Sequence, residues 1–334
     1  MTNVLSVTGK EVQRGTKFSG TINAGFFFPN QPKDYIRRIV QIPYTVIGGK
    51  ENGPTFCATA GMDPTEYAAI AAAIKLSKDI SPDNLKGNLI IVHISNILGF
   101  WERKYISSID YKQLTGVFPG NSTGTTTEIM AHHIYQQFIS KADYYLDMHG
   151  CDINESMTGR SAFYRIGNEQ VDAKSQEMAK ALGHNWVVPH EAKGANKDGP
   201  GSSYKIAALN GIPSALSELG NGDVLLENEM MGQYNAVCNL MKYLGILNGA
   251  PKRNDKQRVV DVTMVGVHHD GLYYSRAMPG DTFEKDDVLG EVKDIFGEVV
   301  ETVHAPARGV VLTMIHNPVV EAGEIVILDY GLLS

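Results

Sequence analysis

The region from residue 55 to residue 247 alternates short apolar segments with longer segments of helical composition, and this alternation limits the possible folds. Apolar runs of strand length predict buried strands, and the longer segments rich in Ala and Leu predict helices. We expect strands at 55–60, 88–95, 144–148 and 214–219, and helices at 66–80, 125–142, 171–182 and 225–247. Such alternation predicts an α/β fold, in which a mostly parallel sheet is covered by helices on both faces.

The sequence changes character near residue 250. Residues 250–256 are polar and contain a proline, which is typical of a linker. The segments that follow predict strands only, at 259–265, 272–275, 288–292, 299–304, 309–314 and 324–330. We therefore predict a first domain over residues 1–250, β-rich in its residues 1–48, and a second domain over residues 257–334 that forms a small β barrel-sandwich.

Composition excludes several classes of partner. The net charge is −7, which disfavours general binding to nucleic acid or to an anionic membrane. The apolar runs are too short for a membrane span, and the first residues lack the pattern of a secretory signal. The three cysteines are scattered and form no disulfide or metal pattern. We predict a cytoplasmic protein that acts on a small molecule, and we leave the formation of a homo-oligomer open.

Acidic or metal-binding side chains stand at the ends of three predicted strands. Asp63 and Glu66 follow the first of these strands, His149 follows the second and Glu218 lies at the third. In parallel sheets, functional sites gather beyond the carboxyl ends of the strands. Asp63, Glu66 and His149 could supply three ligands to a divalent metal and leave a position open for water. Glu218 could then act as the general base that takes a proton from that water.

The same residues also have ordinary structural interpretations. The segment Asp63-Pro64-Thr65-Glu66 is typical of a helix start, with Asp63 as the N-cap and Glu66 reaching back to it. His149 could be a hydrogen-bonded histidine near a strand end, and Glu218 could be a structural carboxylate. The joint placement of the four residues favours the metal site, but their spacing alone does not establish that they converge.

Several short motifs occur in an order that resembles the succinylglutamate desuccinylase/aspartoacylase family, within the wider zinc carboxypeptidase-like fold. The resemblance covers about residues 37–334, and we interpret the chain as a divergent member. The motifs are Thr59-Ala60-Gly61 with Glu66-Tyr67, Asn96, Phe118-Pro119-Gly120, Thr125 to Glu128, Ala142-Asp143-Tyr144, Asp147-Met148-His149-Gly150, Gly211-Ile212-Pro213 and Glu218-Leu219-Gly220.

The resemblance implies a hydrolase with one zinc ion and a catalytic glutamate. By position, Glu66 and His149 match metal ligands of the family, and Glu218 matches its general base. Asp147 matches the carboxylate that orients the last histidine. The family's first ligand is usually a histidine, and here that position is Asp63. Because two carboxylates and one imidazole make a harder, more anionic site, Mn²⁺ or Fe²⁺ becomes an alternative to Zn²⁺.

The residues that bind the substrate carboxylate in the family are also changed. Thr115 and Gly116 stand where the family usually has an Asn-Arg pair, and Tyr105 stands where it has a further arginine near the zinc. Arg103 is a candidate replacement for that arginine. Because the bidentate clamp is missing, we do not expect N-acetylaspartate or succinylglutamate as the substrate. Arg160 and Arg165 are candidate substrate anchors, with solvated surface charges as the alternative.

Two further segments have weaker signals. The glycine-rich residues 193–203 lack the spacing of a phosphate-binding loop and are either a lid at the site or a plain surface loop. The C-terminal motifs resemble a biotinyl/lipoyl-type barrel, but the expected hairpin tip, Phe296-Gly297-Glu298, has no lysine to modify. We therefore predict a cap or interface domain and not a carrier domain.

These observations combine into one functional prediction. A metal held by Asp63, Glu66 and His149 would activate water to cleave the amide bond of a small N-acylated amine or amino acid, with Glu218 as general base. Arg103 or Tyr105 would stabilise the oxyanion. The alternatives are a catalytically inactive ligand-binding or scaffold relative, and a carboxypeptidase that acts on short peptides.

Overall fold

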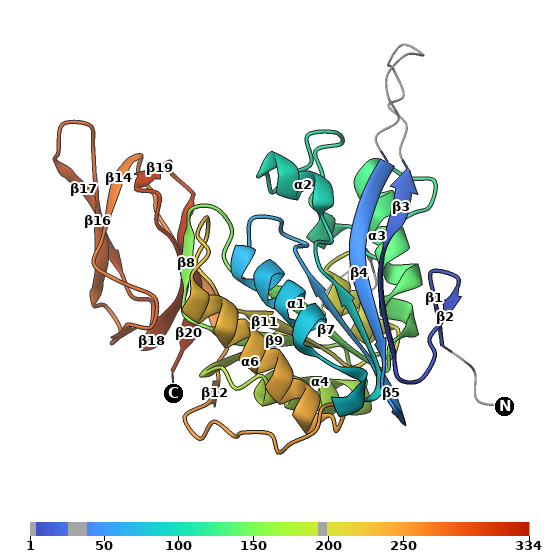
Figure 1. Cartoon of the computed structure of the whole chain (residues 1–334). Helices are drawn as coiled ribbons and strands as arrows, with labels where there is room; N and C mark the ends of the chain where they lie inside the picture. Colours follow the sequence, from blue (N-terminus) through green and yellow to red (C-terminus); the bar gives the residue numbers. More distant parts are fainter. Residues whose placement is uncertain (1–4, 26–38, 193–198, 334) are drawn as a thin grey trace, which may run out of the picture.

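The computed structural model describes residues 5–25, 39–192 and 199–333, and its centre is a sheet of nine described strands (Figure 1). Their spatial order is β12-β10-β9-β11-β7-β5-β6-β4-β3. The bounds are β3 Thr16–Gly25, β4 Ile39–Gly48, β5 Glu51–Ala60, β6 Lys86–Val92, β7 Tyr144–His149, β9 Arg160–Arg165, β10 Trp186–Glu191, β11 Ser214–Glu218 and β12 Arg258–Val259. A short pair, β1 (Ser6–Val7) and β2 (Lys10–Glu11), precedes them.

The central sheet is mixed. The strands β11, β7, β5 and β6 pair in parallel, as do β12, β10 and β9. The two groups meet in the antiparallel pairing of β9 with β11, and β4 and β3 add antiparallel pairings beyond β6. The predicted α/β class is confirmed, and the larger parallel group, of four strands, carries His149 and Glu218 at its strand ends.

Helices cover both faces of this sheet. The bounds are α1 Tyr67–Asp79, α2 Ile97–Glu102, α3 Thr126–Gln137, α4 Glu169–Ala181, α5 Ser203–Leu209 and α6 Glu227–Tyr243. On one face, α1, α4 and α6 pack with Phe56 and Ala58 of β5. On the other face, α3 and α5 pack in the cluster that contains Cys57. Because side chains alternate along a strand, β5 contributes to the apolar layers on both faces of the sheet. Its sequence therefore lacks the alternation of polar and apolar residues that a strand with one solvent-exposed face would have.

The C-terminal part contains two antiparallel sheets, and one strand from the preceding part of the chain pairs with one of them. One sheet has the order β13-β20-β18-β15, with β8 beside β18, and the other has the order β17-β16-β14-β19. The bounds are β8 Glu155–Met157, β13 Val262–Gly266, β14 Gly271–Ser275, β15 Thr282–Phe283, β16 Val288–Lys293, β17 Val299–His304, β18 Gly309–Ile315, β19 Val319–Val320 and β20 Ile325–Leu332. An all-β C-terminal part is therefore observed, and its barrel-sandwich form stays a prediction.

The two parts of the chain are connected by hydrogen-bonded strands in both directions. β12 lies after the predicted linker but pairs in parallel with β10 of the central sheet. β8 lies before the linker but pairs with β18 of the C-terminal part. The predicted division into residues 1–250 and 257–334 therefore stays a prediction. The pairing of β8 with β18 brings C-terminal side chains to the edge of the central sheet where β7 and β11 end.

Some predicted segments fall partly outside the described residues. The predicted lid or loop at 193–203 includes residues 193–198, which the structure does not describe. The hairpin between β16 and β17 exposes Ile295 and Phe296 at its tip, and Lys293 lies over the ring of Tyr274. Among the described residues, no helix is both long enough and apolar enough to span a membrane.

We expect the apolar layer between the sheet and helices α1, α4 and α6 to contribute most to the free energy of unfolding. Leu89 of β6 is fully buried in this layer, so Leu89→Ala should lower the free energy of unfolding by about 2–5 kcal/mol, because it leaves a cavity. Leu225, which is 57% exposed, is the matched control. Leu225→Ala should change the free energy of unfolding by about 0.5 kcal/mol or less. Urea unfolding of both variants measures the difference, and equal losses would contradict this assignment of the core.

Candidate metal centre and active site

Three neighbouring strands end at one edge of the sheet and bring the predicted site residues together. β7 lies between β5 and β11, and the three strands are parallel. His149 ends β7 and pairs in register with Glu218, which ends β11. After β5, the chain turns at Gly61, whose φ of +66° suits glycine, and the following loop carries Asp63 and Glu66. The predicted convergence of the three strand ends is therefore present in the fold.

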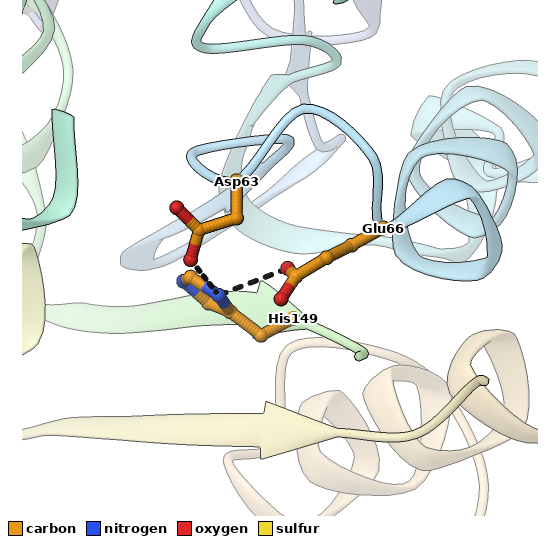
Figure 2. Close-up of side chains that lie close together, drawn as sticks. All are labelled: Asp63, Glu66 and His149. Atoms are coloured by element: carbon orange, nitrogen blue, oxygen red, sulfur yellow. Dashed lines mark ion pairs between the residues drawn. The ribbon is translucent and has the colours of Figure 1, made fainter. Parts of the chain in front are cut away.

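Asp63, Glu66 and His149 form a compact cluster of side chains. His149 Nδ1 lies 3.2 Å from Asp63 Oδ2 and 2.9 Å from Glu66 Oε2, and one ligand atom of each residue lies within 4.8 Å of the other two. Figure 2 shows both carboxylates turned toward the imidazole. The three residues are 8%, 5% and 6% exposed in this order. A buried cluster of two carboxylates and one imidazole has the donor set of a divalent metal site.

The helix-start interpretation of this segment is wrong. Helix α1 begins at Tyr67, so its N-cap is Glu66, and neither Glu66 nor Asp63 caps it with a side-chain hydrogen bond. The helix begins later than the sequence pattern suggests because both carboxylates face His149 instead of the backbone N–H groups of the first turn. These side chains are therefore free for another role.

The charges within the cluster are only partly balanced. Burial raises the pKa of Glu66 well above its usual value, His149 opposes this shift, and Asp63 and Glu218 reinforce it. Burial alone would lower the pKa of His149, but the Glu66 and Asp147 carboxylates outweigh it and raise that pKa well above the usual value. Among the described residues, none donates a well-aligned hydrogen bond to the buried Oε2 of Glu66. A divalent cation would supply the missing partner, so the residues fit a metal.

Asp147, the residue predicted to orient the imidazole, lies next to His149. Its Oδ2 lies 3.4 Å from His149 Nε2, and its side chain is almost completely buried. The hydroxyl of Thr59 donates to Asp147 Oδ1 over 3.0 Å, and the hydroxyl of Ser203 donates to Oδ2. These bonds keep the carboxylate in one position, so that Nδ1 of His149 points toward Asp63 and Glu66.

Glu218 forms a buried ion pair with Arg160 that also includes a C-terminal residue. Arg160 of β9 lies opposite Glu218 in the antiparallel ladder, and its Nη2 lies 2.6 Å from Glu218 Oε2 and 2.7 Å from Asp329 Oδ2. Burial raises the pKa of Glu218, and Arg160 opposes that shift. Arg160 is only 7% exposed, so the interpretation as a solvated surface charge is wrong for this residue. It is correct for Arg165, which pairs with Glu191 at the surface.

A cavity of about 170 Å³ joins the metal cluster to this ion pair. Its lining contains six carboxylates: Asp63, Glu66, Asp152, Glu155, Glu218 and Asp329. Arg160 and His149 are the basic residues of the same lining. Asp152, Glu155 and Asp329 are site residues that were not predicted from the sequence. Asp152 and Glu155 follow His149 closely in sequence. No sequence motif indicates Asp329, because only the folded chain brings β20 to this cavity.

Of the remaining predicted site residues, one lies at the cavity and the others lie outside it. Tyr105 lines the cavity, where burial and the nearby Asp63 raise its pKa. Thr115 lies in a 3₁₀ turn at Leu114–Gly116, and its hydroxyl lies 3.5 Å from Asp63 Oδ1. Arg103, Thr115 and Gly116 do not belong to the residues that line the cavity. Arg103 is exposed at the end of α2 and has a positive φ of 53°.

Comparison with known proteins agrees with this architecture. A sequence model described as the succinylglutamate desuccinylase/aspartoacylase catalytic domain matches residues 52–244. The chain is 24% identical over 261 residues to the N-alpha-acetyl-L-2,4-diaminobutyric acid deacetylase of Halomonas elongata. That match covers 77% of this chain and 75% of the relative.

Two solved structures share the fold over their whole length. One is the product-bound structure of the ectoine utilization protein EutE (DoeB) from Ruegeria pomeroyi, with a TM-score of 0.85 and 23% identity. The other is the succinylglutamate desuccinylase/aspartoacylase from Rhodobacter sphaeroides, with a TM-score of 0.85 and 19% identity. Both alignments cover 100% of each chain, so the C-terminal strands belong to the shared fold.

We predict that Arg160 contributes strongly to stability. Arg160→Met leaves Glu218 and Asp329 buried without their counter-charge, so it should lower the free energy of unfolding by about 3–5 kcal/mol. Arg165→Met is the matched control, since it removes an exposed ion pair and should cost about 1 kcal/mol or less. Chemical unfolding at neutral pH measures both values. Similar small losses for the two variants would show that Arg160 is not the required counter-charge.

Proposed function

Because the chain belongs to the succinylglutamate desuccinylase/aspartoacylase family, we propose that it is a metal-dependent deacylase that hydrolyses the amide bond of a small N-acylated amino acid or amine. The observation that carries this proposal is the single cavity that contains the Asp63, Glu66 and His149 cluster together with Glu218. The deacetylase activity named for the Halomonas elongata relative supports the same reaction class. That relative's named substrate is an acylated diamino acid, and a small cavity suits a substrate of this size.

The proposed metal ligands are Asp63, Glu66 and His149, with Zn²⁺ as the first candidate and Mn²⁺ or Fe²⁺ as alternatives. The cluster supplies one nitrogen and two carboxylate ligands, which all three ions accept. Such an ion, when bound, would polarise the amide carbonyl and lower the pKa of the attacking water. Asp147 would fix the imidazole during turnover, and Thr115 would position Asp63 through its hydroxyl.

Glu218 is the proposed general base. It ends the strand next to His149, so it lies beside the cluster and lines the same cavity. Arg160 favours its carboxylate form against the effect of burial, which is the form that accepts a proton. In the proposed reaction, Glu218 takes a proton from water and returns it to the nitrogen of the leaving amine.

Two other residues of the cavity have proposed roles toward the substrate. Tyr105 is the proposed donor to the oxyanion, since it lines the cavity and its burial keeps the phenol protonated. Arg103, the alternative donor, is exposed outside the cavity lining. Arg160 is the proposed anchor for a substrate carboxylate. Its buried Nε and Nη1 have no hydrogen-bond partner among the described residues, so the N–H groups of both atoms lack an acceptor that a substrate carboxylate could supply.

We propose that the C-terminal strands, as a barrel-sandwich domain, complete this site. Thr313 of β18 and Asp329 of β20 both line the cavity, and Asp329 binds the same guanidinium as Glu218. The predicted cap domain would therefore have a direct part in shaping the substrate pocket.

The metal proposal is tested by calorimetric titration of metal-free protein with Zn²⁺, Mn²⁺ and Fe²⁺. We expect one equivalent to bind, and Asp63→Ala to weaken binding by at least about a hundredfold, because one ligand is lost. Asp63→His should retain tight binding, since it restores the residue typical of the family. Asp329→Asn is the matched control in the same cavity and should leave the metal affinity within about threefold. Binding that survives Asp63→Ala unchanged would rule out this ligand set.

The catalytic proposal is tested on a panel of N-acetylated and N-succinylated amino acids and short peptides. Glu218→Gln should lower kcat by about 10²–10⁴-fold, because the base is removed while the side-chain volume is retained. Glu227→Gln, at an exposed position of α6, is the control and should keep full activity. If metal-loaded protein cleaves no substrate of the panel, the chain is a non-catalytic relative, and if it cleaves only peptides it is a carboxypeptidase.

A further inference from the structure

Two carboxylates of the cavity have no role in the proposed reaction. Asp152 follows His149 by three residues, and Glu155 begins β8. Both line the cavity, and within the described parts of the chain neither forms an ion pair with a basic side chain. Asp152 Oδ1 accepts hydrogen bonds from Thr65 Oγ1 and from the backbone N–H of Ile153. Glu155 Oε2 accepts one from the backbone N–H of Asp152 over 3.3 Å.

The backbone that carries these carboxylates is firmly held. Glu155 N–H donates to Asp152 O over 3.1 Å, and Gly222 N–H donates to Glu155 O over 3.1 Å. A side chain at residue 222 would not fit, because a Cβ there would lie 1.8 Å from Asp152 O. The ladder between β8 and β18 pairs Met157 with Thr313 and fixes the other end of the segment. Asp152 and Glu155 therefore belong to a preorganised wall of the cavity.

A second observation indicates that this wall faces a ligand. The hydroxyl of Thr313 lines the same cavity, and Thr313 is only 2% exposed. Among the described residues, none is a hydrogen-bond partner of its Oγ1. Buried hydroxyl groups are nearly always hydrogen-bonded. A buried hydroxyl that lacks a partner and lines a cavity therefore indicates that a polar group of a ligand binds there. A hydroxyl oxygen can accept a hydrogen bond from an ammonium group, as carboxylates can.

The charge of the cavity selects between substrate classes. Apart from the three proposed metal ligands, the lining has four carboxylates and one guanidinium, and Glu218 and Asp329 share that guanidinium. The acidic side chain of an N-acylated aspartate or glutamate would add another negative charge to this set and would be repelled. A substrate with a free ammonium group would instead offset the excess negative charge.

We propose that Asp152 and Glu155, with the Thr313 hydroxyl, bind a positively charged amino group of the substrate. The enzyme would then prefer N-acylated diamino acids to N-acylated neutral or acidic amino acids. This inference rests on the proposed function, because it assigns the part of the same cavity that recognises the substrate side chain. Arg160 would bind the substrate carboxylate through its free N–H groups, so the two ends of a zwitterionic substrate would each have a partner.

The test compares kcat/KM for Nα-acetyl-2,4-diaminobutyrate with that for N-acetylnorvaline, its neutral isostere, and for N-acetylaspartate. Measurements at pH 8 keep Glu155 ionised, since burial raises its pKa to about 7. The wild-type protein should prefer the diamino substrate to N-acetylnorvaline by at least about tenfold. Asp152→Asn and Glu155→Gln should each reduce this preference by about tenfold, and both changes together should abolish it. A preference that survives the double change, or is absent from the wild type, would overturn the inference.

Three controls separate this inference from the proposed function. The Asn and Gln variants retain the oxygen atoms that accept the local hydrogen bonds, and their unfolding midpoints should match the wild-type value. Glu227→Gln tests the effect of removing an exposed carboxylate outside the cavity, and should leave the preference unchanged. Calorimetry with free 2,4-diaminobutyrate and norvaline measures recognition without turnover. If no substrate is hydrolysed but diaminobutyrate binds through Asp152 and Glu155, the proposed function fails and the assignment of the ammonium site holds. If all substrates are hydrolysed without a preference for the diamino substrate, the proposed function holds and the assignment of the ammonium site fails.

Discussion

The burial of several like charges in one small cavity is the constraint on which the rest of the site depends. Carboxylates that lie close together in a low-dielectric environment repel one another, and each needs a cation or a hydrogen-bond donor nearby. Arg160 meets this need for Glu218 and Asp329, and His149 meets it in part for Asp63 and Glu66. The remaining negative charge fits a divalent ion on one side of the cavity and a cationic substrate group on the other.

The parallel part of the sheet and the three strand ends could be predicted from the sequence. The strand-length apolar runs mark β5, β7 and β11, and a glycine within two residues of the end of each strand marks a turn. Once these strands are taken as parallel neighbours, His149 and Glu218 must stand at one edge. Local pattern located the strand ends that carry these side chains, whereas their convergence depended on the strands being parallel neighbours, which the fold shows.

The contributions that depend on long-range pairing could not be predicted. Asp329 lies 169 positions after Arg160, and only the pairing of β18 with β8 and β20 brings it to the cavity. The same lack of information left Arg160 open to interpretation as a surface charge, because its partners are distant in sequence. At Asp63 the local signal was misleading, since the residue types that favour a helix start are also residue types that can supply carboxylate ligands to a metal. Only the position of His149 distinguishes the two roles.

The reciprocal exchange of β8 and β12 has a consequence for motion. A hinge between two domains normally requires a flexible connection and an interface without shared strands. Here each part contributes a strand to a sheet of the other, so opening by rigid-body rotation would break backbone hydrogen bonds in two ladders. The two ladders therefore oppose any widening of the proposed substrate cavity by rotation of one part of the chain against the other.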